Sequence, residues 1–258
     1  MHTIQNEYLS LKKIASSGQC FRWRRLGNDK YEILAFGRML IAEQAGNIIM
    51  LDCSEEEFYT LWHEYFDLDC DYSQYHRAAE ESGLEFLKQA SEYSRGIRIL
   101  RQELWETLVS FIISQNNNIP RICLCLERII ARFGHFPAQG EITEDSLEGL
   151  GLGYRDGYLY DAARQFSPDM QDFSLICGVG PKVNSCVRLF GLSKKDEFPR
   201  DVWIKRLETE HFGGRFPEER FAGFAGVMQQ FLYYYGRSEN YIKHLNSSSN
   251  NSPRSGSP

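Results

Sequence analysis

Long hydrophobic runs and a regular cysteine pattern are both missing from this sequence of 258 residues. The longest apolar run, residues 108–113, is far shorter than the roughly 20 residues that a membrane-spanning helix needs. The N-terminus lacks a basic stretch followed by an apolar one, so we expect no signal peptide and no membrane partner. The seven cysteines are an odd number without the spacing of a disulfide framework. These absences predict an intracellular protein in a reducing compartment.

The composition is that of a globular protein, with 42% hydrophobic and 14% aromatic residues. A net charge of −6 argues against a nucleic-acid partner when the chain is taken as a whole. The charges are uneven, however: residues 52–92 hold twelve acidic and two basic residues, whereas residues 177–206 hold seven basic and three acidic ones. Because binding to a polyanion depends on the face presented, charge leaves open both a DNA-binding face and two ordinary solvated faces.

The first fifty residues are typical of an antiparallel sheet. Short apolar segments separated by turn residues, the spacing of a β-meander, lie at 20–24, 30–36, 39–43 and 47–51. After them Ser54 and Glu57 form the sequence pattern of a capping box, which predicts that a helix begins there.

Helical periodicity dominates after Ser94. Apolar stripes predict helices over 104–112, 122–133, 155–166 and 217–235, and Gly134 is expected to close the second. The predicted fold class is α+β, mainly α, with an N-terminal antiparallel β-sheet domain that also holds helices (1–94) and a helical domain (95–245). The tail, 246–258, is mostly Ser, Asn, Pro and Gly, and we expect it to be disordered.

A tight turn at Gly178-Val179-Gly180 is followed by Pro181, which favours the first position of a helix. The glycines allow close approach of another group to the backbone, and the free N–H groups of a helix start can bind an anion. This pattern fits the hairpin of a helix-hairpin-helix element that grips a DNA phosphate. On its own it fits a helical hairpin inside a protein core equally well.

Two polar residues in this region can combine into a reactive pair. Asp201 stands at the start of a predicted helix, 202–210, and a helix and turn after Lys182 can bring the two residues together. Beside low-dielectric walls the ammonium of a lysine can lose its proton, and the free amine is a nucleophile for an electrophilic carbon. Taken singly, an exposed lysine and a helix-capping aspartate are the commoner readings.

Six sequence motifs occur one after another between about residue 17 and residue 235. They are SGQCFRW (17–23), SQNNNIPR (114–121), LGYR (152–155), CGVGPK (177–182), FPRD (198–201) and QQFLY (229–233). The chain thereby resembles the helix-hairpin-helix DNA glycosylases with a Gly/Pro-rich loop and an aspartate, and within them the 8-oxoguanine DNA glycosylases. The resemblance implies a helix-hairpin-helix glycosylase core in the helical domain.

The resemblance also implies a bifunctional DNA glycosylase and AP lyase of base excision repair. Lys182 would be the catalytic amine that attacks C1′ of the damaged nucleoside to form a Schiff base. Asp201 would stabilise the positive charge developing on the sugar and help to take the proton from Lys182. Strand scission by β-elimination would follow.

Base chemistry in duplex DNA requires the damaged base to leave the stack. By resemblance, Asn116 would enter the gap left by the flipped base, Arg121 and Arg155 would hydrogen-bond the orphaned cytosine, and Tyr154 would wedge into the stack. A capping role for the asparagines 116–118 is the plainer alternative.

The resemblance implies a lesion pocket in which a main-chain carbonyl recognises the damaged base and two side chains stack against it. The carbonyl of Gly18 would accept the N7 hydrogen that distinguishes 8-oxoguanine from guanine. Gln229 would read the Watson–Crick edge, and Cys186 and Tyr233 would sandwich the ring. Two departures from the family pattern are Trp203, where many relatives place a histidine, and the hydroxyl of Tyr233.

Other functions fit the same residues less well. The chain has no cysteine after Cys186, so the iron–sulfur cluster of an endonuclease III type glycosylase cannot be built. The Cys123-x-Cys125 pair has the wrong spacing for zinc, and Lys182 argues against an alkyladenine glycosylase. A non-catalytic DNA-binding protein and a glycosylase with another lesion preference stay open. We expect no cofactor, no metal, and a monomer that binds duplex DNA containing 8-oxoguanine opposite cytosine.

Overall fold

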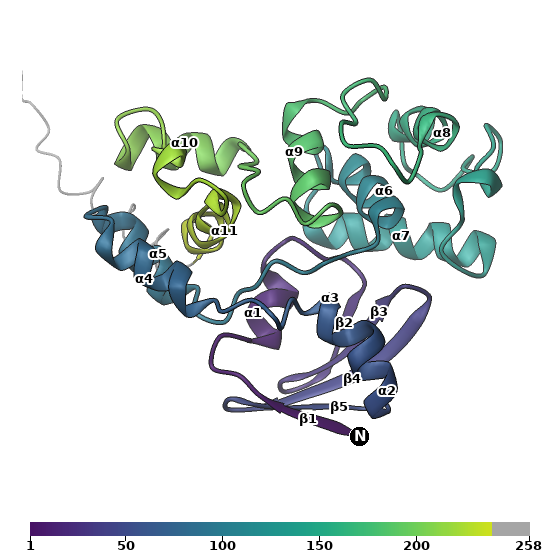
Figure 1. The fold of residues 1–258 in the computed structure, drawn as a ribbon. Helices are drawn as coiled ribbons and strands as arrows, with labels where there is room; N and C mark the ends of the chain where they lie inside the picture. The colour runs from purple at the N-terminus through teal and green to yellow at the C-terminus, as the bar shows by residue number, and fades with distance from the viewer. Residues whose placement is uncertain (239–258) are drawn as a thin grey trace, which may run out of the picture.

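The structure, a computed structural model, describes residues 1–238. The predicted tail (246–258) and the last residues of the predicted helical domain (239–245) lie outside the described residues. A five-stranded antiparallel sheet forms the N-terminal part (Figure 1). Its strands are β1 (His2–Gln5), β2 (Trp23–Gly27), β3 (Lys30–Ala35), β4 (Arg38–Ala45) and β5 (Ile48–Leu51).

The predicted meander is confirmed, because β2, β3, β4 and β5 are neighbours in that order. Strand β1 was not predicted; it adds to the free edge of β5, with His2 opposite Leu51. In β3 every second residue is buried, as the alternation of apolar residues requires of a sheet with one covered face. The helix α1 (Leu11–Ser16) contributes Leu11 and Ile14 to the same core.

A helical segment follows the sheet directly, as predicted. The hydroxyl of Ser54 accepts a hydrogen bond from the backbone N–H of Glu57, so the cap exists. The segment comprises α2 (Glu55–Glu57), a π-helical turn (Phe58–Trp62) and α3 (His63–Tyr65). Trp62 is fully buried there in the core of the sheet.

Two further helices leave the sheet and join the C-terminal part of the chain. They are α4 (Ser73–Glu81) and α5 (Glu85–Tyr93), and α5 packs along α11 (Ala225–Gly236). Both helices contribute residues to the large core that the later helices share. The division of the chain at residue 94 therefore stays a proposal.

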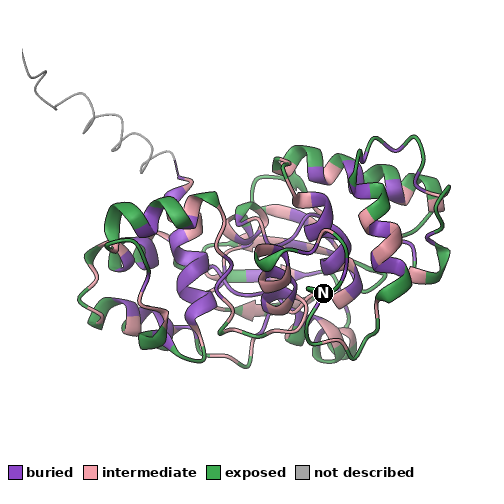
Figure 2. Cartoon of the chain, turned by 90° about the horizontal axis from the view of Figure 1, so that it is seen from above, coloured by how far each residue is buried: buried purple, intermediate pink, exposed green. Residues whose placement is uncertain are grey.

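The remaining helices build that large core. They are α6 (Leu104–Ser114), α7 (Ile119–Phe133), α8 (Arg155–Gln165), α9 (Pro181–Phe190) and α10 (Val202–His211). Gly134, with φ of 77°, closes α7 as expected. Figure 1 shows two groups of helices above the sheet, α4, α5, α10 and α11 on one side and α6 to α9 on the other. In Figure 2 the buried residues of both groups turn toward the middle of the molecule.

One predicted helical segment differs in the structure. The helix expected over 217–235 is a 3₁₀ turn (Glu218–Phe221) followed by α11, because Gly223 takes a φ of 89° that interrupts the helical backbone. The helix expected over 155–166 is confirmed as α8, which ends at Gln165, and turns then lead to α9. Apolar spacing cannot report the break at Gly223, since the residues on either side keep the same periodicity.

Candidate active site

The hairpin 177–180 is held tightly against α8. The N–H of Cys177 donates to Oδ2 of Asp161 at 2.7 Å. Gly178 has a φ of 81°, and a Cβ at this position would lie 2.2 Å from Cδ2 of Tyr158, so glycine is required on both counts. Gly180 then caps α9, and Pro181 occupies its first turn, as the sequence predicted. This turn aims the N-terminus of α9, and with it Lys182, toward the space between the two helix groups.

Lys182 lies in the first turn of α9 with its Nζ 5.1 Å from the centre of the Phe111 ring. Burial lowers the pKa of its amine, but the charges of nearby groups outweigh burial and leave the pKa above the usual lysine value; these groups are Cys186, Tyr233 and Asp201. Burial raises the pKa of Cys186, so this thiol is neutral near pH 7 and Asp201 supplies the negative charge. Burial and the charge of Asp201 therefore act in opposite directions on the pKa of Lys182.

Asp201 caps the helix α10. Its Oδ1 accepts a hydrogen bond from the backbone N–H of Ile204 at 2.9 Å, which fixes the carboxylate at the helix start. Burial raises the pKa of Asp201 above the usual aspartate value, although the capping N–H groups and Lys182 act in the opposite direction. The carboxylate is thus fixed at the helix start in a half-buried position, where the charge of Lys182 acts on it without an ion pair within 4.0 Å.

A cavity of about 800 Å³ opens between the two helix groups and joins these residues. Its lining includes five of the residues predicted from sequence: Gly18, Asn116, Lys182, Asp201 and Tyr233. Gly180 of the hairpin also reaches it. A single cavity therefore connects the predicted nucleophile, its carboxylate, one pocket wall and the residue expected to fill the DNA stack.

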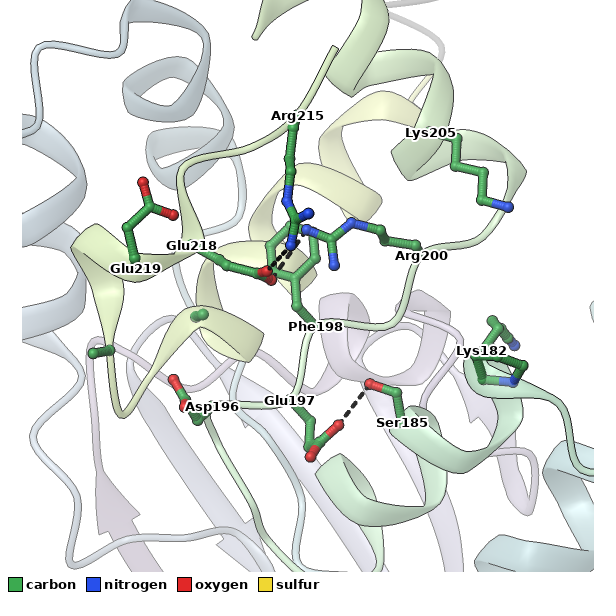
Figure 3. A pocket seen from close by; sticks show the side chains of 13 residues that line it. Lys182, Ser185, Asp196, Glu197, Phe198, Arg200, Lys205, Arg215, Glu218 and Glu219 are labelled. Atoms are coloured by element: carbon green, nitrogen blue, oxygen red, sulfur yellow. Dashed lines mark hydrogen bonds and ion pairs between the residues drawn. The ribbon is translucent and has the colours of Figure 1, made fainter. Parts of the chain in front are cut away.

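A second cavity of about 910 Å³ lies on the other side of Lys182 (Figure 3). Part of its charged lining is engaged in ion pairs, such as those of Arg200 and Arg215 with Glu218. Asp201 does not line it. Because the reactive pair meets only at the cavity of about 800 Å³, that cavity is the candidate active site, and we call it the Lys182 cavity.

In one wall of the Lys182 cavity, Gly18 lies close to Tyr233 and Arg237, which are far from it in the sequence. Gly18 has a φ of 76°, and a Cβ there would lie 3.3 Å from Cε1 and from Oη of Tyr233. The Tyr233 hydroxyl accepts a hydrogen bond from Nη1 of Arg237 at 3.0 Å. The extra hydroxyl at position 233 is therefore used in a hydrogen bond inside this wall.

Two predicted lesion-pocket residues lie behind the wall instead of lining the cavity. Cys186 is buried one turn along α9 from Lys182. Gln229 is buried, its Nε2 donates to the carbonyl of Pro199, and its Oε1 accepts from Gln230. For Gln229 to read a base edge, its side chain has to exchange these internal hydrogen bonds for contacts with the base.

The residues predicted to face the opposite strand meet at one rim. Asn116 has a φ of 51°, and its Nδ2 donates to the hydroxyl of Tyr154 at 3.0 Å. Arg155 is largely buried; its Nε donates to the carbonyl of Gln115, and its Cζ lies 4.4 Å from the centre of the Tyr154 ring. Arg121 is exposed and donates to the carbonyl of Gly151. Of the two arginines, Arg121 has the more accessible side chain.

Sequence reasoning missed several side chains that line the Lys182 cavity. Phe111 had been assigned only to an apolar stripe, and Arg237 had been given no role. The available signal for Arg237 was its spacing, since a residue four positions after Tyr233 in a helix lies on the same face. Trp203, noted as a departure, also lines the cavity.

The described residues, 1–238, hold no candidate metal site and no candidate membrane span. In this part of the chain no group of three or more histidine, cysteine or acidic side chains is arranged to hold a metal ion. No helix there is both long enough and apolar enough to cross a membrane.

Comparison with known proteins identifies the family. Residues 2–108 match the family model of the 8-oxoguanine DNA glycosylase N-terminal domain. The N-glycosylase/DNA lyase of Saccharomyces cerevisiae is 30% identical over 265 residues, which cover 81% of this chain and 70% of the yeast protein.

Two solved structures share the fold over nearly the whole chain. MBOgg1 in complex with a low-affinity DNA ligand has a TM-score of 0.84 and 33% identity, covering 91% of this chain and 94% of its own. The Clostridium acetobutylicum 8-oxoguanine glycosylase/lyase, in complex with double-stranded DNA containing cytosine opposite 8-oxoG, has a TM-score of 0.83 and 30% identity, covering 93% and 99%. The chain thus belongs to the 8-oxoguanine DNA glycosylase family.

Proposed function

We propose that this protein is a bifunctional DNA glycosylase and AP lyase that removes 8-oxoguanine from duplex DNA. The observation that carries the proposal is the placement of Lys182 and Asp201 at the starts of two consecutive helices, both facing the Lys182 cavity. A primary amine beside a fixed carboxylate can form a covalent bond to a sugar carbon that becomes electron-poor. Relatives named N-glycosylase/DNA lyase and 8-oxoguanine glycosylase/lyase support this assignment.

In the proposed reaction the damaged nucleotide leaves the stack and enters the Lys182 cavity. The ammonium of Lys182 first gives up a proton, for which Asp201 is the neighbouring acceptor. The amine lone pair then forms a bond to C1′, the C1′–N9 bond breaks, and its electron pair leaves with the base, which takes up a proton. Asp201 passes the proton on to water, and its carboxylate, again charged, stabilises the positive charge on the sugar during this step.

Opening of the sugar ring then converts the adduct to a Schiff base. The protonated imine makes the 2′ hydrogen acidic, and its removal expels the 3′ phosphate by β-elimination. Hydrolysis of the imine restores the Lys182 amine. One lysine can therefore serve both the glycosylase and the lyase steps.

DNA recognition is proposed for the hairpin and for the rim of the cavity. The hairpin Gly178-Val179-Gly180 would bind a phosphate of the duplex through the N–H groups of its two glycines, because the N–H of Val179 already donates to the carbonyl of Ile176 at 3.0 Å. Asn116 and Tyr154, already joined by a hydrogen bond, would fill the stack, while Arg121 and Arg155 address cytosine opposite the lesion. We propose that the protein acts on DNA as a monomer.

The test is borohydride trapping on a panel of duplexes that contain 8-oxoguanine, guanine or another damaged purine opposite each of the four bases. A trapped adduct and strand cleavage on 8-oxoguanine opposite cytosine are expected. Binding without any trapped adduct would leave only a non-catalytic DNA-binding protein. Trapping on a different lesion would keep the nucleophile and change the substrate.

A further inference from the structure

Arg237 places a positive charge in the wall of the Lys182 cavity that faces the lesion. It follows α11 directly, and its guanidinium carbon lies 5.0 Å from the centre of the Tyr233 ring. Its Nη1 also lies 3.5 Å from the position that a Cβ of Gly18 would take. The guanidinium thus contacts Tyr233 and lies near Gly18, two of the residues proposed to face the damaged base.

This charge is not neutralised by a direct ion pair. Among residues 1–238, no carboxylate forms an ion pair with Arg237 within 4.0 Å. The side chain is half-buried, so solvent screens its charge less than it would at an open surface. Arg237 also lowers the pKa of Tyr233, which burial as the larger effect raises, so its charge acts on groups of this wall.

Other cations around the cavity have different surroundings. Arg200 pairs with Glu208 and Glu218, and Lys182 is assigned to the attack on C1′. Lys205 is exposed on α10. Among the described residues, Arg237 is therefore the cation of the cavity that contacts the lesion wall and has no carboxylate within 4.0 Å, although its charge also lowers the pKa of Asp201.

The chemistry of base release requires such a charge. When the C1′–N9 bond breaks, its electron pair stays on the purine, which carries negative charge until it is protonated. A cation fixed beside the base stabilises this charge more in the transition state than in the ground state, and so accelerates departure.

We propose that Arg237 is a catalytic residue of base release, which stabilises the negative charge on the departing 8-oxoguanine from the Tyr233 side of the cavity. This inference rests on the proposed glycosylase function. The lyase step on a site that has already lost its base involves no departing purine and gives a separate measurement.

The experiment compares single-turnover base excision from 8-oxoguanine duplex with strand cleavage of a preformed abasic duplex. For Arg237→Met we expect base excision to slow about 10- to 100-fold and the ratio of excision to abasic cleavage to fall at least tenfold. Arg237→Lys, which keeps the charge, should recover part of the ratio. Arg38→Met, at an exposed site on β4, is the matched control.

Each alternative result has a distinct meaning. Equal slowing of both rates by Arg237→Met would overturn the proposal and favour a DNA-phosphate contact or a structural role. The proposal would also be overturned if Arg237→Met excised the base at the full rate, with an unchanged ratio of excision to abasic cleavage. If the unsubstituted protein cleaves abasic DNA but does not excise 8-oxoguanine, the proposed substrate is wrong, and the inference falls with it. Thermal unfolding checks that the variant is folded, and Tyr233→Phe tests whether the hydrogen bond alone carries the effect.

Discussion

Nζ of Lys195 lies 2.6 Å from Oδ2 of Asp67, whose carboxylate is completely buried. Arg101 approaches the same carboxylate to 3.0 Å, and the hydroxyl of Tyr72 donates to it. Lys195 belongs to the loop between α9 and α10, and its carbonyl accepts the N–H of Gly226. Lys195 therefore attaches the loop between α9 and α10 at two points. Its side chain binds Asp67, after α3, and its carbonyl binds Gly226 of α11.

Lys195→Met is expected to lower the free energy of unfolding by about 2–3 kcal/mol, because it leaves a buried carboxylate with fewer partners. Base excision should slow as well, since the loop that spaces α9 and α10 loses its anchor. Urea unfolding measures the first effect and single-turnover kinetics the second. Lys30→Met, which removes an exposed pair with Glu43, should cost less than about 1 kcal/mol. Equal losses for both variants would show that burial of the Asp67 pair is unimportant.

Lys182→Gln should abolish borohydride trapping and strand cleavage, because an amide nitrogen has no nucleophilic lone pair. Binding to lesion duplex should persist, as the hairpin 177–180 and the rim residues are unchanged. Gel-shift titration and trapping measure the two properties. Lys194→Gln, on the loop after α9, is the control and should trap normally. Cleavage retained by Lys182→Gln would place the nucleophile elsewhere.

Asp201→Asn should slow base release by at least about 100-fold while the protein stays folded. An asparagine Oδ1 can keep the hydrogen bond to the N–H of Ile204, so the cap of α10 survives and the lost charge is isolated as the cause. Single-turnover excision and thermal unfolding should be measured together. A near-normal excision rate would contradict the role assigned to Asp201.

The sequence predicted most of the sheet and the helix starts because local chemistry decides them. Ser54, Gly134 and Pro181 each act through their own backbone position, and all three stand where the patterns placed them. Strand β1 escaped prediction because its partner β5 lies far along the chain. The surroundings of Lys182 escaped for the same reason: the opposing effects of burial and of Asp201 on its pKa are set only in the packed structure.

In the candidate site, too, the sequence predicted residues that belong to local motifs but not contacts that depend on packing. Motifs supplied Gly18, Asn116, Lys182, Asp201 and Tyr233, which line one cavity. The internal hydrogen bonds of Gln229 were not predictable, since the motif carries no information about Pro199. Arg237 lay outside every motif, and its contact with Tyr233 required the coordinates of α11.

Preference for cytosine opposite the lesion should depend on Arg121 more than on Arg155. Excision opposite cytosine should exceed excision opposite adenine, and Arg121→Ala should narrow this ratio without lowering stability by more than about 0.5 kcal/mol, because its side chain is exposed. Arg155→Ala should also destabilise the protein, since it leaves the carbonyl of Gln115 without its donors. Kinetics on both duplexes and urea unfolding provide the comparison. Equal rates opposite the two bases in the unsubstituted protein would refute both assignments.

The free energy of unfolding should change with pH because Glu106 ionises at a different pH in the folded and the unfolded protein. Burial raises the pKa of Glu106 to about 7, even though Arg22 pairs with it at 2.5 Å and acts in the opposite direction. A carboxyl group with a raised pKa in the folded state binds more protons there than in the unfolded chain between about pH 4.5 and 7.

The contribution of Glu106 to stability is therefore fully present below pH 4.5 and is lost as the pH rises through 7. We expect it to lower the free energy of unfolding by on the order of 1–3 kcal/mol between pH 5 and 8. Glu106→Gln cannot ionise but keeps an oxygen acceptor for Arg22, so its stability should change less over the same range. Urea unfolding of both proteins at several pH values measures the difference, and parallel curves would show that Glu106 is ionised throughout.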